Sequence, residues 1–217
     1  HGGITATITY STSDRVRVTL TGPAVTDRNQ WYSENPRRIG RPSLPQTFEL
    51  VGRDSRGNAV VKYGFVLKQW FVSRGNMSYY YYPSMESWCN KIGYRLPKVR
   101  DLTNASCQPR RGESQDVCQG VESATPSSPD NSSRRHIGGG LFSEWGNMSD
   151  YETNSDDSSK FLFNAPYCTQ DTVAGTNNPN LTNIFSVFDG GGQNGNLGQI
   201  YIYPHTSGVY GGVCVYP

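Results

Sequence analysis

Long apolar runs are missing from this sequence. No hydrophobic stretch approaches the roughly twenty residues that a helix needs to cross a bilayer, so we expect no membrane insertion by this fragment. The first residues, His1-Gly2-Gly3, also lack the charged and apolar segments of a signal peptide. An element that exports or anchors the protein is therefore expected outside these 217 residues.

Charge is also scarce, because only 18% of the residues are charged and the net charge is +2. All twenty Lys and Arg lie at or before Lys160, and residues 161–217 carry only Asp171 and Asp189. Arginine pairs occur at Arg37/Arg38, Arg110/Arg111 and Arg134/Arg135. A nucleic-acid surface usually shows a clustered basic stripe, which these scattered pairs do not form. We therefore expect no nucleic-acid partner.

Histidine is nearly absent, and the residues that usually carry catalysis form no motif. His1 is terminal, and neither His136 nor His205 stands beside a nucleophile motif. The adjacent acids Asp156 and Asp157 lie in a Ser/Asn-rich stretch where solvated carboxylates are expected. The five cysteines show no CxxC pair or metal-ligand spacing. The sequence therefore favours no enzyme, no metal and no cofactor.

Abundant Gly, Tyr, Asn and Ser favour a loop-rich β protein over a helical bundle. Residues 4–10 and 15–22 alternate apolar or β-branched with polar residues, which is the period of a half-buried strand. After a Pro/Arg-rich connection at 24–46, the alternation resumes at 47–54 and continues through 59–72. This pattern predicts a β-sandwich-like or β-sheet module over residues 4 to about 72.

Two short helices are predicted next. Residues 85–92, MESWCNKI, place apolar side chains at helical spacing, with Ser84 as the expected N-cap and Gly93 as the C-terminal stop. Residues 97–105, PKVRDLTNA, predict a second short helix with Pro97 near its first turn.

The rest of the chain is irregular and then extended. Residues 107–137 show almost no apolar periodicity, which predicts a functional loop or a partly disordered segment. Four later runs are short, β-branched or aromatic, and separated by Gly/Asn turns, so they predict strands of one antiparallel sheet. These runs are residues 160–168, 183–190, 199–204 and 208–217.

Disulfides in an oxidising compartment fit the cysteines better than a zinc site does. A bridge between Cys107 and Cys118 would close a short loop, and one between Cys89 and Cys214 would tie the two ends of a domain together. Cys168 would then be left over, either buried and inert or paired with another chain. Free cysteine behaves as a small hydrophobe, so we favour the inert interpretation.

The order of these elements resembles the C-type lectin-like fold. The motifs WFVSRG, SWCNKIGYRLPKVRDLTNA, GGGLFSEWGNMSDY and GGVCVYP together resemble the terminal part of the intimin/invasin family of bacterial outer-membrane adhesins. In that family an Ig-like domain precedes a C-type lectin-like tip. The resemblance covers about residues 47–217. It implies a mostly β fold, with an Ig-like β-sandwich domain at 1–75 and a C-type lectin-like domain of two short helices, an antiparallel sheet and long loops at 76–217.

Several residue roles follow from this resemblance alone. Cys89 and Cys214 match cysteines that are bridged in the lectin-like fold. Framework positions are matched by Trp88, Leu96, Pro97, Leu102 and Trp145. The other three cysteines and the long loop at 107–137 depart from the family pattern. The family also implies a location on the bacterial cell surface, with anchoring to the outer membrane by a region N-terminal to this fragment.

Binding to a host protein, either a cell-surface receptor or a secreted protein, is the function that the resemblance implies, and we expect the fragment to be a monomer. Exposed Tyr, Asn, Ser, Gly and Arg provide rigid anchors and adaptable hydrogen bonds for such a contact. The residues we select for it are Arg110, Arg111, Arg134, Arg135, Tyr203, His205 and Tyr210. The alternative is carbohydrate binding, calcium-dependent or not. The nearest candidate for a calcium site, Asn178-Pro179-Asn180, lacks the carboxylate that Ca²⁺ favours.

Overall fold

The structure, a computed structural model, is mostly β, with antiparallel strand pairs and short helices. It describes residues 2–12, 15–75, 78–109, 111–112, 114–151, 160–162, 164–173, 183–190, 197–205 and 209–217. Within these ranges, no helix combines the length and the apolar character needed to span a membrane.

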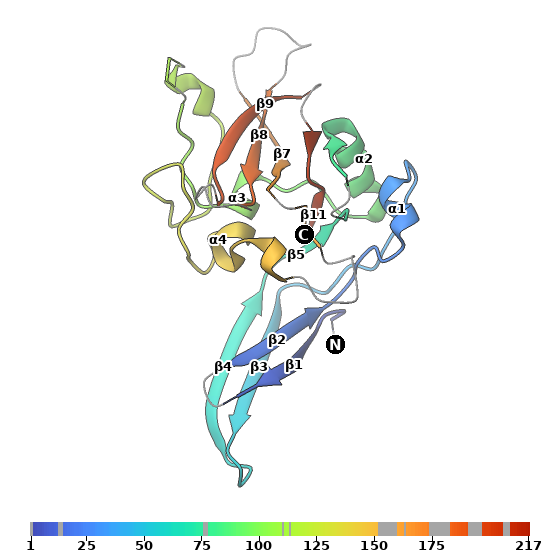
Figure 1. Ribbon diagram of the computed structural model, residues 1–217, viewed down its shortest axis with the longest axis vertical. Helices are drawn as coiled ribbons and strands as arrows, with labels where there is room; N and C mark the ends of the chain where they lie inside the picture. Colours follow the sequence, from blue (N-terminus) through green and yellow to red (C-terminus); the bar gives the residue numbers. More distant parts are fainter. Residues whose placement is uncertain are drawn as a thin grey trace.

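Two antiparallel hairpins form an elongated part that we call the stalk, residues 5–21 and 46–67 (Figure 1). Its strands are β1 (Thr5–Ser11), β2 (Val16–Thr21), β3 (Gln46–Arg53) and β4 (Ala59–Leu67). These bounds lie close to those predicted from the alternating pattern, because a period of two is a strong local signal for strands.

The stalk does not show the packed core of a sandwich. Among the described residues each hairpin forms its own two-stranded sheet, β1-β2 and β3-β4. Neither hydrophobic cluster of the protein includes a residue from these four strands. Large apolar side chains such as Ile8, Val60 and Tyr63 are exposed. The strands are therefore present, but the Ig-like sandwich expected over residues 1–75 is not confirmed.

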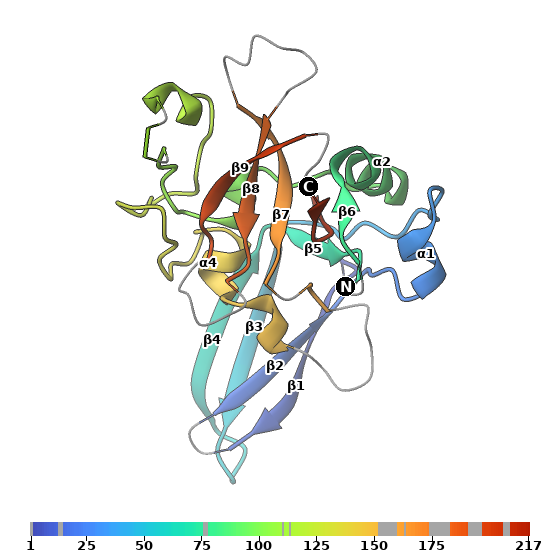
Figure 2. The same cartoon turned by 45° about the horizontal axis from the view of Figure 1, so that its top comes forward.

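The remaining elements form a second part, which we call the head, consisting of α1 and residues 70–217 (Figures 1 and 2). Its helices are α1 (Arg28–Tyr32), α2 (Tyr82–Ile92), α3 (Val99–Leu102), α4 (Leu141–Trp145) and the 3-10 helices η1 (Gln115–Cys118) and η2 (Met148–Tyr151). Its strands are β5 (Trp70–Ser73), β6 (Tyr80–Tyr81), β7 (Pro166–Thr172), β8 (Asn183–Phe188), β9 (Ile200–Pro204), β10 (Val209–Tyr210) and β11 (Val213–Tyr216).

Among the described residues, the late strands do not join the single antiparallel sheet that the sequence suggested. β7, β8 and β9 form a three-stranded antiparallel sheet, whereas β10 pairs with β6 and β11 pairs with β5. Phe71 lies opposite Val215, so β5 belongs to the head and not to the module predicted to end near residue 72. Local sequence pattern cannot specify which distant strand is the partner, and here the partners β5 and β6 precede α2.

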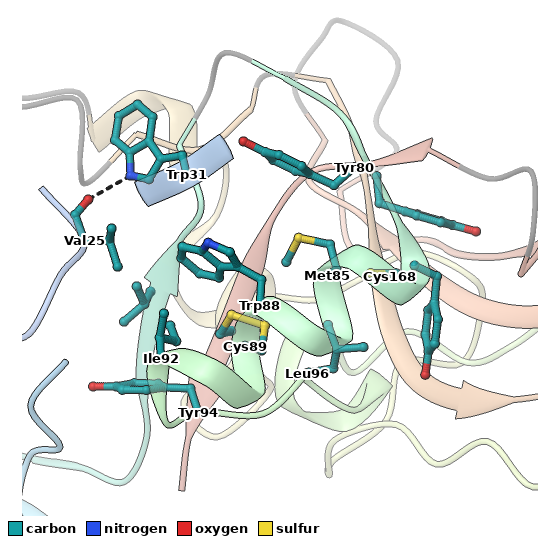
Figure 3. Close-up of a cluster of buried hydrophobic side chains, with 14 of the residues drawn as sticks. Val25, Trp31, Tyr80, Met85, Trp88, Cys89, Ile92, Tyr94, Leu96 and Cys168 are labelled. Carbon is teal, nitrogen blue, oxygen red and sulfur yellow. Dashed lines mark hydrogen bonds between the residues drawn. A yellow bond between two sulfur atoms is a disulfide. The ribbon is translucent and has the colours of Figure 1, made fainter. Parts of the chain in front are cut away.

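Helix α1 was not predicted, because the connection at 24–46 is rich in Pro and Arg. Its Trp31 is fully buried, and the indole Nε1 donates a hydrogen bond to the Val25 carbonyl at 2.8 Å (Figure 3). Trp88 of α2 donates from Nε1 to the Gln30 carbonyl at 2.8 Å. The connection is therefore part of the head core and not a bare linker.

Helix α2 follows the predicted pattern, with one correction. Met85, Trp88, Cys89 and Ile92 are buried, as their helical spacing predicts (Figure 3). Ser84 lies inside the helix instead of capping it, since Tyr81 is the N-cap. The stop is confirmed: Gly93 adopts φ 95°, a left-handed conformation that glycine reaches without steric cost. Helix α3 is also present, as predicted for residues 97–105.

The predicted cysteine pairing is confirmed. Cys89 and Cys214 are bridged across a sequence separation of 125, which joins α2 to β11, and Cys107 is bridged to Cys118. Cys168 is free and buried in the cluster around α2, as the inert interpretation required. Of the framework positions, Trp88, Leu96, Pro97 and Leu102 are buried, and Trp145 is partly buried.

The segment between α3 and α4 follows a defined path where it is described. Asn104 is central to this path, because its side chain accepts from the Arg134 amide at 3.0 Å and donates to the Arg134 carbonyl at 3.1 Å. Further along, the Asn131 side chain pairs with the backbone of Ile200 at the start of β9. Polar side chains thus replace a hydrophobic pattern in holding this loop, which explains its lack of periodicity.

Candidate functional site

The arginines selected from the sequence lie in the loop segment. Arg111 is exposed within the loop that Cys107 and Cys118 close, and Arg110 lies outside the described residues. Arg134 and Arg135 are also exposed. The Arg134 guanidinium lies 3.8 Å from the Asp130 carboxylate, an exposed ion pair that contributes little to stability. Arg111, Arg134 and Arg135 are therefore accessible for contact.

Tyr203, His205 and Tyr210 are brought together at the start of α2. The rings of Tyr203 and Tyr210 meet edge to face with their centroids 6.2 Å apart. The His205 ring lies 4.4 Å from the ring of Tyr82, the first residue of α2. In Figures 1 and 2, α2 and β6 lie on one side of the β7-β8-β9 sheet and the loop segment between α3 and α4 lies on the other. The two groups selected from the sequence thus belong to two separate surfaces.

Tyr210 must be corrected as a contact residue, because its side chain is completely buried. Its hydroxyl donates to the Pro204 carbonyl at 3.3 Å, and burial raises the pKa of the phenol. Tyr210 therefore packs beneath the surface and supports Tyr203, which is partly exposed. His205 is also partly exposed.

The pairing of β6 with β10 decides which of the neighbouring side chains reach solvent. Tyr80 lies opposite Tyr210 and both point inward, whereas Tyr81 lies opposite Val209 and both are exposed. Successive strand residues point to opposite faces, so Tyr79 and Tyr81 emerge on the outside, with 49% and 58% of their surface accessible. We call Tyr79, Tyr81 and Val209 the tyrosine surface; Tyr203 and His205 lie nearby, against the rings of Tyr210 and Tyr82.

The three members of this surface were not selected from the sequence. The run of four tyrosines at 79–82 could have indicated exposed tyrosines, because an extended segment alternates its side chains between two faces. Residues 209–210 form only a two-residue strand, and their pairing with β6 joins positions that are far apart in the chain. Which tyrosines face outward therefore depends on tertiary contacts.

A buried arginine stabilises the base of the tyrosine surface. Arg74 donates from Nε to the Trp31 carbonyl at 2.7 Å and from Nη1 to the Ser84 hydroxyl at 3.0 Å. Its guanidinium lies 4.0 Å from the centroid of the Tyr80 ring, within cation–π range. Desolvation lowers the pKa of Arg74 to about 10. Arg74 thus links α1, α2 and β6 behind the exposed Tyr81.

Two depressions lie on the loop side of the head, and Glu122 lines both. The smaller, about 230 Å³, also includes Lys98, Arg100, Gly120 and Asp171. The larger, about 430 Å³, is lined by Ser106, Cys107, Cys118, Val121, Glu122, Ser123, Thr125 and Ser127. Charges of both signs meet in the smaller one, and its Asp171 carboxylate accepts a hydrogen bond from the Val99 amide at 2.6 Å. This carboxylate therefore caps α3.

Within the described ranges, no three or more His, Cys, Asp or Glu side chains gather in a way that could hold a metal ion. The Asn178-Pro179-Asn180 triplet and the acids Asp156 and Asp157 lie outside the described residues.

Comparison of the chain with protein-family models, with curated proteins and with solved structures gave no match.

Proposed function

We propose that this chain is the distal tip of a bacterial surface adhesin of the intimin/invasin type, and that its head binds a host protein without catalysing a reaction. The order of the sequence motifs supports the family, and the tyrosine surface supports protein recognition. Anchoring to the outer membrane by a more N-terminal region is part of this proposal.

The outward pair of Tyr81 and Val209 is the observation that carries the proposal. Tyrosine offers a large contact area at low entropic cost, since only two side-chain torsions must be fixed. Here the strand pairing and Arg74 hold the backbone beneath it. A partner would gain apolar contact with Val209 and hydrogen bonds with the phenol of Tyr81, which is the mixture typical of the centre of protein interfaces.

The loop arginines remain a second proposed contact group on the other side of the head. Arg111, Arg134 and Arg135 are exposed, so they would act as rim charges that increase the association rate with an acidic partner. Arg110 stays in this proposal, although it lies outside the described residues. A partner that contacts both groups would have to reach around the head.

Binding of the labelled chain to host cells and to purified host surface proteins tests the proposal. We expect saturable binding that is lost when the cells are treated with protease. Replacing both Tyr79→Ser and Tyr81→Ser is expected to weaken it at least about tenfold, whereas Tyr10→Ser, an exposed tyrosine of the stalk, should have no effect. Binding that is unchanged in the double variant would contradict the role of the tyrosine surface.

Binding to a glycan panel, assayed with and without EDTA, distinguishes carbohydrate binding from host-protein binding. Binding to isolated glycans that disappears with EDTA would indicate a calcium-dependent lectin, and binding that persists would indicate a calcium-independent one. Either result, combined with protease-resistant binding to cells, would replace host-protein recognition by carbohydrate recognition.

A further inference from the structure

Strand β4 is the outer strand of the stalk. Its hydrogen-bonded neighbour among the described residues is β3, and the opposite edge is open in both Figure 1 and Figure 2. The strand is nine residues long, AVVKYGFVL, and most of its side chains are apolar. Val60, Val61 and Tyr63 have 65%, 60% and 58% of their surface exposed. A long apolar edge of this kind is a template for pairing with another strand.

The devices that usually protect an edge strand are weak in β4. Natural edges carry charges, proline or a central bulge, or are very short. β4 has no proline, and its only charged residue is Lys62. That charge is already paired, because the Lys62 ammonium lies 2.7 Å from the Glu49 carboxylate of β3. The register shift of the hairpin falls at its turn end, beside Arg53, so the central part of the edge is regular.

We propose that β4 pairs antiparallel with β4 of a second copy of this chain, with Tyr63 opposite Tyr63. This register is symmetric, as a two-fold dimer requires. It places Val61 opposite Phe65, Val60 opposite Val66 and Ala59 opposite Leu67. Apolar side chains then meet apolar side chains on both faces, and Lys62 lies opposite Gly64, where no side chain opposes it.

The neighbouring symmetric registers are less favourable. Centring the pair on Lys62 places the two lysines opposite each other, and like charges in that position destabilise a sheet. Centring it on Gly64 places Lys62 opposite Val66 and brings Lys68 against Val60. Moving the centre by one residue shifts the pairing of the two strands by two residues, which keeps each side chain on its own face of the sheet. These two registers are therefore the nearest alternatives. The charge pattern of β4 thus selects the register centred on Tyr63.

The resulting four-stranded sheet, β3-β4-β4-β3, would extend an aromatic row that already exists in each hairpin. The rings of Phe48 and Phe65 are stacked with centroids 5.1 Å apart, and Tyr63 lies 6.1 Å from Phe65. The paired strands run in opposite directions, so the two heads lie at opposite ends and their tyrosine surfaces stay free. This proposal goes beyond the proposed function and replaces the sequence-based expectation of a monomer.

Analytical ultracentrifugation of the full 217-residue chain, from about 1 µM to about 1 mM, tests the dimer. Gly64→Lys is the diagnostic variant, since it sets two additional like-charge pairs against Lys62 of the other copy. A Cβ at Gly64 meets only the Phe48 carbonyl oxygen, at 3.6 Å, so the hairpin itself has room for it. We expect the dissociation constant to rise roughly tenfold, with Gly64→Ser as the near-neutral control.

Cysteine cross-linking tests the register. Under mild oxidation Tyr63→Cys should form an intermolecular disulfide, because directly opposed residues have Cα atoms within the range that a disulfide spans. Val66→Cys on the same strand should not, since the two positions would be about 20 Å apart. A chain that stays monomeric throughout the concentration range would overturn the proposal. So would a dimer that Gly64→Lys leaves intact, or one in which both cysteines cross-link equally.

Discussion

Arg74 shows, at the scale of single residues, how a charged side chain can be kept in a protein core with no salt bridge to any residue that the structure describes. It is 2% exposed, yet its donors reach the Trp31 carbonyl and the Ser84 hydroxyl, and two aromatic rings cover its guanidinium. The rule that arginine lies at the surface would place Arg74 in solvent. Only the three-dimensional arrangement of carbonyl groups and rings shows that burial is possible here.

Arg74→Leu is expected to destabilise the protein by about 2 to 4 kcal/mol, because it leaves buried acceptors without donors and removes the cation–π contacts. Arg74→Lys should recover little, since a single ammonium cannot reproduce the planar fork of donors. Urea unfolding followed by tryptophan fluorescence measures the change. Arg100→Leu, at an exposed position, is the control and should stay within about 0.5 kcal/mol. Equal effects of the two leucine variants would contradict the structural role of Arg74.

Cys168 should make the protein sensitive to alkaline pH. Burial raises the pKa of its thiol from 9.0 to about 12, so the folded state keeps a proton that the unfolded chain loses. The resulting stability is present below pH 9 and is lost as pH rises toward 12. Cys168→Ala should therefore show a smaller fall in melting temperature between about pH 8 and about pH 10.

Buried tyrosines such as Tyr94, whose pKa is raised to about 12, also cause a loss of stability at alkaline pH. This loss is the same in the wild type and in Cys168→Ala. The comparison between wild type and Cys168→Ala thus isolates the thiol. Reaction of the native protein with a thiol reagent should also be slow, and should become fast in urea. Rapid reaction in the native state would contradict the burial of Cys168.

At the scale of elements, local patterns predicted what lies within one segment and not how segments pair. The helical spacing of 85–92 and the glycine stop were sufficient for α2, and the alternation at 4–22 and 47–67 was sufficient for the two stalk hairpins. The bridge between Cys107 and Cys118 could be predicted from the sequence because the two cysteines are only 11 residues apart. By contrast, α1 is a single short turn held by Trp31, and the splitting of the late strands depends on partners that precede them.

Gly93→Ala tests the boundary of α2. The backbone at Gly93 has φ 95°, and a Cβ there would lie 3.1 Å from Nε of Arg38, so both strain and crowding oppose a side chain. We expect a loss of about 1 to 2 kcal/mol in the free energy of unfolding. Gly93→Asn should cost less than alanine, because asparagine tolerates left-handed backbone better. The reverse order of the two variants would argue against a conformational origin.

At the scale of the whole molecule, the head and the stalk are stabilised in different ways. The head and the connection at 24–46 together contain both hydrophobic clusters, and the head contains both disulfides, whereas the stalk depends mainly on strand pairing. The two parts meet at Trp70, whose Nε1 donates to the Pro23 carbonyl at 2.8 Å. The sequence predicted a β-sandwich-like or β-sheet module here, because alternation shows that a strand has an apolar face. It does not show what covers that face.

Removal of the two disulfides should therefore destabilise regions of different size. Chain-entropy estimates give about 4 to 5 kcal/mol for the bridge between Cys89 and Cys214, and roughly 3 kcal/mol for the bridge between Cys107 and Cys118. The first joins α2 to β11 inside a hydrophobic cluster, so replacing both of its cysteines by alanine should reduce protection from hydrogen exchange across the cores of the head.

Replacing both Cys107 and Cys118 by alanine should increase the rate of hydrogen exchange mainly between α3 and α4, because that bridge closes an exposed loop. In both variants the β3-β4 hairpin should keep its wild-type exchange pattern, since neither cluster extends into it. Faster exchange in β3 and β4 after loss of the bridge between Cys89 and Cys214 would show instead that the head and the stalk unfold as one cooperative unit. In that case the junction at Trp70 would transmit stability from one part to the other.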